Sequence, residues 1–241
     1  MDNPLLFFFL LVLSVAVFGT LIALLGRFRP VEFSDQMATR WGQVNLWMQR
    51  VICGLDYRLE GAENLPAGAC IVMSKHQSTW ETIALRGLLK PQQSWVLKQE
   101  LLQIPLFGQG LTLVKSIPID RAAGRRAVLK VVEMGKARLA EGRYVIIFPE
   151  GTRTAPGQRR KYGVGGGVLA ERSGADVVPI AHNAGVYWRR RGVKKYPGTV
   201  RVIVGAAIAS TNKNAAQIMR EVEDWIEKTQ ETLPNKGENS E

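Results

Sequence analysis

The chain has 241 residues, of which 46% are hydrophobic, and its formal net charge is +11. A positive balance of this size favours an anionic partner, such as a nucleic acid, an anionic membrane surface or a phosphorylated substrate, and composition does not choose among these. The two cysteines, Cys53 and Cys70, lack metal-type spacing and argue against both a disulfide framework and a zinc site. Only His76 and His182 are available for histidine chemistry.

Residues 5–25 form an uncharged apolar run of 21 residues, long enough to cross a hydrocarbon core of about 30 Å. A cleaved signal peptide is the weaker alternative, because the start lacks a positive region and the run is too long. Arg27, Arg29 and Arg40 follow the run, and this excess of arginine predicts that the remainder faces the cytoplasm. We therefore expect a membrane protein of the bacterial inner membrane. Whether the first helix spans the bilayer or dips into one leaflet stays open.

Residues 32–55 are predicted to form an amphipathic helix at the membrane surface. Apolar side chains recur at spacings of three and four, and tryptophans with arginines nearby suit the headgroup region. These apolar positions are Trp41, Val44, Met48, Val51, Ile52 and Leu55. An ordinary helix packed on the protein core is the alternative. This divides the chain into a membrane-anchoring helix pair, residues 1–55, and one domain, residues 56–241.

From residue 56 onwards, short β-rich runs alternate with helical patterns. The strand candidates are residues 70–73, 94–97, 116–119, 144–148, 176–180 and 200–204. Residues 125–141 and 214–233 have the periodicity of amphipathic helices. This alternation predicts an α/β domain, with a mostly parallel or mixed sheet flanked by helices.

A first candidate for chemistry lies in residues 74–81, with the sequence SKHQSTWE, where a strand is followed by a helix. An imidazole with a carboxylate behind it forms a general-base pair, and His76 with Glu81 is the candidate. On one continuous helix these side chains would lie about 140° apart, so His76 must lie in the loop and Glu81 in the first helical turn. Ser78-x-x-Glu81 also matches a capping box, which would give Glu81 a purely structural role. Ser78 as a covalent nucleophile is less favoured, because no Gly-x-Ser-x-Gly elbow is present.

A second candidate site is the segment 148–153, with the sequence FPEGTR, directly after the strand candidate 144–148. Gly151 lets the backbone turn sharply after the strand. Arg153 offers a planar fork of donors to a phosphate, and Thr152 with nearby amides can add further donors. A turn with a solvated arginine is the alternative.

Two further cations lie at predicted strand ends. Arg121 follows the strand candidate 116–119, and Lys98 follows the strand candidate 94–97. Each alone can be an ordinary solvated side chain. Together with Arg153, they predict a shared anion pocket near His76.

The order of these motifs resembles the glycerolipid acyltransferase superfamily, specifically the 1-acyl-sn-glycerol-3-phosphate acyltransferases, over roughly residues 56–204. The segments that resemble the family's four motifs are residues 76–81 (His-x4-Asp), 116–121 (ending in arginine), 148–153 (containing Glu-Gly-Thr-Arg) and 177–180. One position departs from the family: Glu81 stands where the family usually has Asp. A backbone or rotamer change must absorb the extra methylene.

The resemblance implies an α/β fold with a hydrophobic acyl channel on a membrane-seated helix pair. It also implies direct acyl transfer from acyl-CoA or acyl-carrier protein to the sn-2 hydroxyl of lysophosphatidic acid, without a metal or other cofactor. His76 would remove the hydroxyl proton while Glu81 orients the imidazole. An ordinary imidazole, with a pKa of about 6.5, suits this role at neutral pH.

The same resemblance assigns the acceptor phosphate to basic residues. Arg121 and Arg153 would hold the phosphate, with Lys98 as a helper. Gly151 and Thr152 would complete this subsite as part of the third motif. Glu150 would either orient Arg153 or contact the glycerol.

Three alternatives remain at this point. A membrane-tethered nucleic-acid binder is disfavoured, because the basic residues are spread along the chain without a recognition motif, so no nucleic-acid partner is predicted. A non-catalytic lipid-binding relative is opposed by the complete set of His and Arg residues. The acceptor could instead be another lysolipid, such as a lyso-ornithine lipid or lysophosphatidylglycerol.

Three remaining features receive interpretations of their own. The densest basic cluster comprises Arg189, Arg190, Arg191, Lys194 and Lys195, and can contact anionic lipid, attract an acidic carrier protein or remain solvated. The glycines of residues 163–167 lack the Gly-Lys-Ser/Thr ending of a nucleotide-binding loop, so we expect them to permit close packing at a helix start. His182 is expected to be structural.

Overall fold

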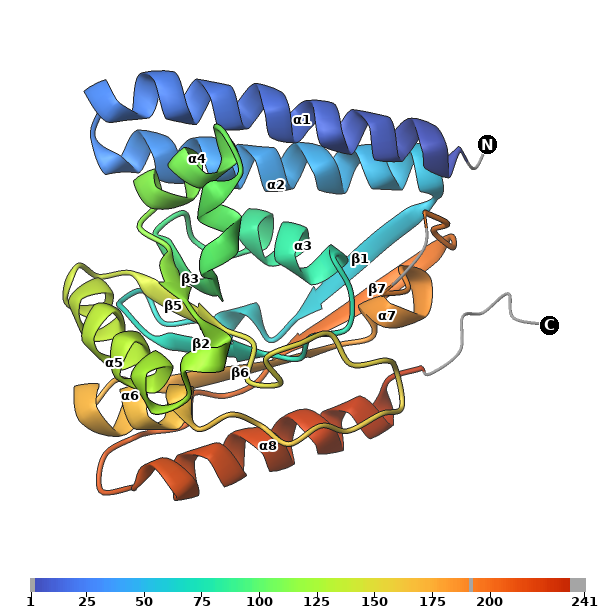
Figure 1. Cartoon of the computed structure of the whole chain (residues 1–241). Helices are drawn as coiled ribbons and strands as arrows, with labels where there is room; N and C mark the ends of the chain where they lie inside the picture. The colour runs from blue at the N-terminus through green and yellow to red at the C-terminus, as the bar shows by residue number, and fades with distance from the viewer. Residues whose placement is uncertain (1–2, 191–192, 235–241) are drawn as a thin grey trace.

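A seven-stranded sheet with helices on both faces forms the centre of the molecule (Figure 1). The computed structural model describes residues 3–190 and 193–234. Helices α1 to α4 cover one face of the sheet, and helices α5, α6 and α8 cover the other. The predicted α/β class, with a mostly parallel or mixed sheet, is confirmed.

The sheet has the strand order β1-β7-β6-β2-β5-β3-β4. Its strands are β1 (Leu55–Glu60), β2 (Ile71–Ser74), β3 (Gln93–Lys98), β4 (Ile117–Ile119), β5 (Tyr144–Ile147), β6 (Val177–His182) and β7 (Gly198–Val204). Among the described residues, only the β6–β7 pair is antiparallel. All six predicted strands are present, with shifts of up to two residues at their ends. The sequence analysis missed β1, whose segment LDYRLE is half charged and has only one fully buried residue.

The side chains of the central strands point alternately to the two faces of the sheet, and each face has its own hydrophobic core. On β2, Ile71 and Met73 face the layer of α5, α6 and α8, while Val72 faces the layer of α2 and α3. On β5, Val145 and Ile147 face the first of these layers. Successive side chains of a strand point to opposite faces, so an unbroken apolar run fills both cores.

The helices flank the sheet in two layers. Their bounds are α1 (Pro4–Leu25), α2 (Val31–Cys53), α3 (Trp80–Leu88), α4 (Phe107–Leu113), α5 (Arg125–Ala140), α6 (Gly165–Ser173), α7 (Ala184–Tyr187) and α8 (Ala215–Thr232). Helices α5 and α8 confirm the two helices predicted from periodicity. The glycines at the start of α6 do permit close packing, since a Cβ on Gly166 would lie 2.4 Å from Met73 and one on Gly167 would lie 2.6 Å from Met219.

One face of helix α2 packs on the domain, and another face carries exposed apolar side chains. Its buried Asp35 makes a bidentate ion pair with Arg143, at 2.6 and 2.7 Å. Its Gly42 meets Gly87 of α3 so closely that a Cβ there would lie 2.6 Å from a backbone nitrogen. The alternative of a helix packed on the core therefore describes this inner face.

The apolar stripe predicted for α2 is divided in the structure. Met48 is buried, whereas Val51 is 62% exposed and the flanking Trp47 is 64% exposed. Placing Leu55 in this helix was wrong, because α2 ends at Cys53 and Gly54 adopts a left-handed conformation, with φ of 59°. Leu55 instead begins β1 and is fully buried.

Helix α1 runs alongside α2 across the surface of the domain (Figure 1). Near its start, Phe7 makes an edge-to-face contact with Trp188, with ring centroids 5.5 Å apart. Near its end, the buried Ile22 approaches Gly110 of α4. Within the described residues this is the one helix long and apolar enough to cross a membrane. However, both of its ends contact the domain, so it does not project away from the domain as a separate spanning helix.

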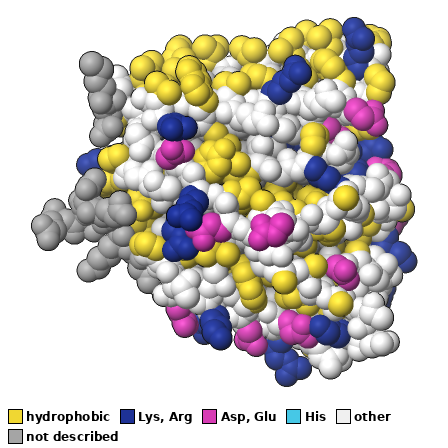
Figure 2. Space-filling view, turned by 180° about the vertical axis from the view of Figure 1, so that it is seen from behind, with side chains coloured by type: hydrophobic (Ala, Val, Ile, Leu, Met, Phe, Trp, Pro, Cys, Tyr) yellow, Lys and Arg dark blue, Asp and Glu magenta, His cyan; other side chains and the backbone are white. Residues whose placement is uncertain are grey.

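The outer side of α1 is strongly apolar. Figure 2 shows hydrophobic side chains gathered along the edge of the molecule that α1 forms, with a few basic side chains towards one end of that edge. The large exposed apolar residues of α1 are Leu5, Leu6, Phe8, Phe9, Val12, Leu13, Val17, Leu21, Leu24 and Leu25. A contiguous exposed surface of this kind indicates contact with a membrane or another apolar partner.

Candidate active site

Four neighbouring parallel strands bring the predicted site residues to one edge of the sheet. The strands β2, β5, β3 and β4 are adjacent and run in the same direction. His76 follows β2, Arg153 lies in the loop after β5, Lys98 ends β3, and Arg121 follows β4. Because the carboxyl ends of parallel strands meet at one edge, residues far apart in the sequence become neighbours.

The His76–Glu81 pair has the geometry of an oriented general base. His76 lies in the loop before α3, and its Nδ1 is 2.8 Å from Oε1 of Glu81, in the first turn of α3. The same oxygen accepts hydrogen bonds from the amides of Gln77, at 2.7 Å, and Ser78, at 2.8 Å. The carboxylate of Glu81 therefore binds loop amides at the start of α3, as one half of a capping box would, and also contacts the imidazole.

The environment of Glu81 keeps its side chain ionised. Burial raises the pKa of this carboxyl, but His182, His76 and the Ser78 amide lower it more strongly, to about 2. The Oγ of Ser78 donates to Oε2 of Glu81 at 3.0 Å and accepts from the Trp80 amide at 2.8 Å. The hydroxyl of Ser78 thus makes hydrogen bonds that stabilise the loop. This agrees with the prediction that Ser78 is disfavoured as a nucleophile.

The imidazole of His76 is held on its flat side as well. It stacks on Phe148, with ring centroids 4.1 Å apart and planes 16° apart. Among residues 3–190 and 193–234, no hydrogen-bonding protein partner occupies Nε2. With Nδ1 bound to Glu81, Nε2 is the nitrogen available to a substrate hydroxyl.

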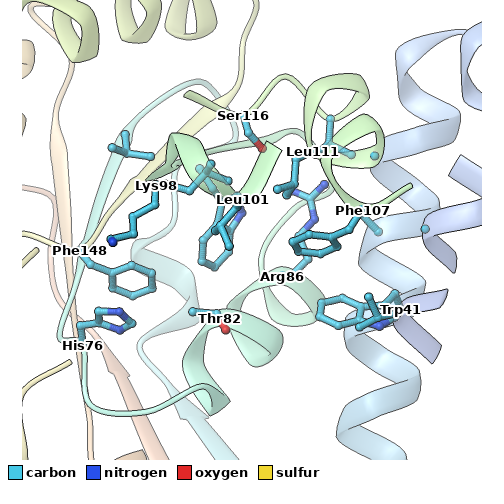
Figure 3. A pocket seen from close by; sticks show the side chains of 18 of the residues that line it. Trp41, His76, Thr82, Arg86, Lys98, Leu101, Phe107, Leu111, Ser116 and Phe148 are labelled. Atoms are coloured by element: carbon cyan, nitrogen blue, oxygen red, sulfur yellow. The ribbon is translucent and has the colours of Figure 1, made fainter. Parts of the chain in front are cut away.

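His76 lies at one end of a mainly apolar cavity of about 540 Å³ (Figure 3). The walls of the cavity come from α1, α2, α3, α4 and β3. Figure 3 shows His76 stacked on Phe148 at one end, with Lys98 above this pair and Trp41 at the opposite end. The cations predicted from the sequence also line the cavity, namely Lys98, Arg121 and Arg153, together with Thr152. A base, a group of cations and an apolar chamber therefore share one space.

Arg121 is connected to the loop that carries Arg153. Its guanidinium donates a hydrogen bond to the carbonyl oxygen of Gly151. Gly151 itself has φ of +66°, a conformation that favours glycine, so the turn predicted after β5 is present. This bond holds the loops that follow β4 and β5 next to each other, which places Arg121 beside the segment 151–153.

Comparison with known proteins assigns the family. The family model described as Acyltransferase matches residues 56–183. A 1-acyl-sn-glycerol-3-phosphate acyltransferase of Pseudomonas aeruginosa is 41% identical over 228 residues, which cover 93% of this chain and 88% of that protein. The chain belongs to the acyltransferase family. The resemblance inferred from the order of the motifs is thereby confirmed, and the protein is an enzyme of this class.

More distant relatives agree with this acyltransferase assignment. A 1-acyl-sn-glycerol-3-phosphate acyltransferase of Helicobacter pylori is 27% identical over 148 residues, covering 61% of this chain and 62% of that protein. The crystal structure of the 1-acyl-sn-glycerophosphate acyltransferase PlsC from Thermotoga maritima superposes with a TM-score of 0.72. It is 21% identical and covers 93% of this chain and 95% of that chain, so it shows that the fold is shared.

The surroundings of Glu150 in this acyltransferase differ from those expected. Its side chain is buried, with Oε1 2.9 Å from the ammonium of Lys75 and Oε2 accepting from the His76 amide at 2.7 Å. These contacts are thus with Lys75 and the His76 amide rather than with Arg153, and Glu150 is not among the residues that line the cavity. The sequence motif indicated a glutamate at this position but not the direction of its side chain.

The sequence analysis missed a buried charge cluster of the acyltransferase behind His76. Lys75 lies 2.7 Å from Glu227 of α8 in addition to its contact with Glu150. Tyr162 donates to Glu227 at 2.8 Å. The available signals were a lysine next to His76 and a glutamate beside the inward-facing Ile226 of α8.

His182 has the structural role expected of it. It is fully buried, with Nε2 2.8 Å from the carbonyl oxygen of Lys75 and Nδ1 accepting from the Ala184 amide at 3.2 Å. Burial lowers its pKa, which suits a neutral imidazole with its proton on Nε2. Of the basic cluster, Arg190 lines the cavity, while Arg191 lies outside the described residues.

Proposed function

We propose that this acyltransferase transfers an acyl chain from a thioester to the sn-2 hydroxyl of lysophosphatidic acid, forming phosphatidic acid. The observation that carries the proposal is the cavity that His76, paired with Glu81, lines together with Lys98, Arg121, Arg153 and an apolar chamber. An acceptor with a phosphate, a free hydroxyl and an acyl chain matches these three environments. The Pseudomonas and Helicobacter relatives are named 1-acyl-sn-glycerol-3-phosphate acyltransferases, which supports this choice of acceptor.

In the proposed reaction, Nε2 of His76 removes the proton from the sn-2 hydroxyl while Glu81 stabilises the imidazolium that forms. The resulting alkoxide attacks the carbonyl carbon of the thioester and forms a new C–O bond. When the tetrahedral intermediate collapses, the C–S bond breaks, and the departing thiolate takes the proton back from the imidazolium. Atoms and charge balance without an acyl-enzyme.

The acceptor phosphate is assigned to Arg121, Arg153 and Lys98. An arginine offers parallel donors that match phosphate oxygens, and a lysine adds a point charge. Thr152 lies on the same wall and can donate through its hydroxyl. The phosphate thereby anchors the glycerol so that its hydroxyl reaches His76, and positioning of this kind contributes several kcal/mol to catalysis.

The acyl chain of one substrate is assigned to the apolar part of the cavity, between α1, α3 and α4. Phe18, Leu101, Phe107 and Leu111 line this part. Burial of each methylene contributes about 0.8 kcal/mol, so a chain of ordinary length gains much of its binding energy there. A thioester of either acyl-CoA or acyl-carrier protein can supply this chain, and both remain candidate donors.

The enzyme is proposed to sit in one leaflet of the bacterial inner membrane through the exposed faces of α1 and α2. Both ends of α1 contact the domain, through Phe7 and Ile22, so the helix pair can immerse its outer face without crossing the bilayer. Residues of α1 and α2 line the cavity together with the domain, so the proposed route of a lipid acceptor is from the membrane past these helices. The predicted cytoplasmic side agrees with thioester donors made in the cytoplasm.

A second acceptor class remains a candidate, namely other lysolipids such as lyso-ornithine lipid or lysophosphatidylglycerol. A cluster of cations favours the terminal phosphate of lysophosphatidic acid, which carries more negative charge than a phosphodiester or a zwitterion. For this reason lysophosphatidic acid is the first choice.

The test is acyl transfer by the purified enzyme and its His76→Ala variant in detergent. Each of the three lysolipids is offered with acyl-CoA and with acyl-carrier protein. We expect lysophosphatidic acid to be the preferred acceptor, and His76→Ala to lower kcat about 10²-fold or more because the base is removed. Turnover close to that of the unmodified enzyme in a folded His76→Ala variant would refute the mechanism. A preference for another lysolipid would refute the acceptor.

A further inference from the structure

The two residues that flank His76 are both held by one face of the C-terminal helix. The ammonium of Lys75 lies 2.7 Å from Oε1 of Glu227, and the side-chain Nε2 of Gln77 donates to Oε1 of Gln230 at 2.9 Å. Glu227 and Gln230 are three residues apart on α8, so their side chains lie on neighbouring turns of the same face. His76 is thus the middle residue of a tripeptide that α8 holds at both ends.

The Lys75 attachment is buried and charged. Lys75 is 1% exposed, and its ammonium has a carboxylate on each side, from Glu150 at 2.9 Å and Glu227 at 2.7 Å. A buried cation costs several kcal/mol unless such partners surround it, so the lysine cannot readily move away from them. Glu150 also accepts from the His76 amide. The same cluster therefore fixes both the side chain of residue 75 and the backbone of residue 76.

The Gln77 attachment is made of neutral hydrogen bonds that continue into β6. Gln77 accepts from the Gly185 amide at 3.0 Å, while Gln230 donates to the carbonyl oxygen of His182 at 2.9 Å. His182 in turn contacts the Lys75 carbonyl oxygen at 2.8 Å. The loop is therefore held through side chains and backbone groups that share α8 as their common support.

Helix α8 has no place in the substrate cavity itself. Among the described residues, none of the cavity-lining side chains comes from α8, which covers the face of the sheet opposite α1 and α2 (Figure 1). Its influence on the reaction must therefore be indirect. Glu227 also contacts Tyr162 and Arg159 of the segment after β5, but the tripeptide 75–77 is the attachment that carries His76. A reacting group displaced by about 1 Å can lose about 10²-fold in rate, so a small shift of this loop has a large effect.

We propose that Glu227 and Gln230 are positioning residues that set the location of the His76 imidazole relative to the acceptor hydroxyl. This inference rests on the proposed function and deepens it. Because Lys98 ends β3 while Arg121 and Arg153 follow β4 and β5, all outside the tripeptide 75–77, loss of the α8 attachments should change the chemical step more than it changes acceptor binding. Neither residue belongs to the four sequence motifs.

The test compares kcat and KM for Glu227→Leu, Glu227→Gln, Gln230→Leu and the control Lys228→Leu. We expect Glu227→Leu and Gln230→Leu to lower kcat about 10-fold to 10²-fold while the KM for lysophosphatidic acid changes less than about threefold. Glu227→Gln keeps an oxygen acceptor for Lys75 and Tyr162, so its kcat should recover to within about threefold of the unmodified enzyme. Lys228 is exposed on the same helix, and its variant should change kcat less than about twofold.

The outcomes separate positioning from general stability. Circular dichroism and the thermal midpoint first establish that each variant is folded. If folded Glu227→Leu and Gln230→Leu keep kcat within about twofold, or if only the KM rises, the inference is overturned. Gln230 is only half-buried, so Gln230→Leu decides the question if Glu227→Leu does not fold. A failure of His76→Ala to lose activity would instead overturn the proposed function, and this is measured without any change in α8.

Discussion

Oε1 of Glu81 is shared between the imidazole of His76, at 2.8 Å, and the backbone amides of Gln77 and Ser78, at 2.7 and 2.8 Å. One carboxylate oxygen thereby connects the imidazole to the loop that carries it. The longer side chain of Glu, in place of the usual Asp of the family, reaches the imidazole and the amides together from the first turn of α3. Orientation of the base and the start of the helix are consequently coupled.

Changing the length or charge of residue 81 tests this coupling. We expect Glu81→Gln to lower kcat about 10²-fold, because an amide does not stabilise an imidazolium. Glu81→Asp should lower kcat about 10-fold, because the shorter carboxylate cannot reach the imidazole and both amides at once. Steady-state kinetics with the folded variants measures both effects. Full activity of Glu81→Asp would show that the longer side chain has no geometric role.

Acid should expose the contribution of Glu81 to stability. Its pKa falls from an ordinary value of 4.5 to about 2 in the folded protein, so its ionised form stabilises the fold above about pH 4.5, and this contribution is lost as the pH falls towards 2. Urea titrations at several pH values should give a steeper decrease in unfolding free energy for the unmodified protein than for Glu81→Gln. Parallel decreases would contradict the lowered pKa.

Removal of an arginine from the phosphate subsite should weaken acceptor binding selectively. We expect Arg153→Ala to raise the KM for lysophosphatidic acid about 10-fold to 10²-fold, because a charge-assisted pair with the phosphate is lost, while the KM for the thioester changes little. Arg126→Ala is the matched control, since Arg126 is exposed on α5 and does not line the cavity. An effect confined to the thioester KM would contradict the assignment of the phosphate.

A larger side chain at Gly110 should shorten the acyl chain that the enzyme prefers. Gly110 lines the cavity, and only Ile22 lies near the position of an added Cβ, at 3.7 Å. Gly110→Leu therefore has room to fill part of the apolar chamber, and each displaced methylene loses about 0.8 kcal/mol of burial. Relative rates with a series of thioesters measure the preference. Gly68→Leu is the control, because residue 68 has open space around it and lies outside the cavity. This variant should leave the preferred chain length unchanged.

Charge on the outer face of α1 should release the enzyme from membranes. Leu13 and Leu129 are equally exposed, at 46%, but Leu13 lies on α1 and Leu129 on α5. We expect Leu13→Asp to reduce sedimentation with phospholipid vesicles severalfold, because a carboxylate is poorly tolerated among acyl chains, whereas Leu129→Asp should bind as the unmodified protein does. Equal binding by both variants would place the membrane contact elsewhere.

Local patterns were sufficient to predict most of the fold. Apolar runs between turn residues predicted six strands correctly, and the periodicities of α5 and α8 were clear. The strand β1 was missed because three of its six residues are charged and its formation depends on pairing with β7, whose partner residues follow more than 140 positions later in the chain. Likewise, the stripe on α2 could not reveal that Asp35 is buried against Arg143, because that pair joins distant parts of the chain.

By itself, the sequence determined the fold class, the family and the chemical groups of the site, because the periodicity of burial and the types of reactive side chain are local properties. Tertiary structure alone decided the directions of those side chains: Glu150 turns towards Lys75, and α1 lies against the domain at both ends. It also showed that Glu227 of α8 supports the loop of His76. Such contacts depend on how the parallel strands and their covering helices bring distant segments together, and no spacing along the chain encodes them.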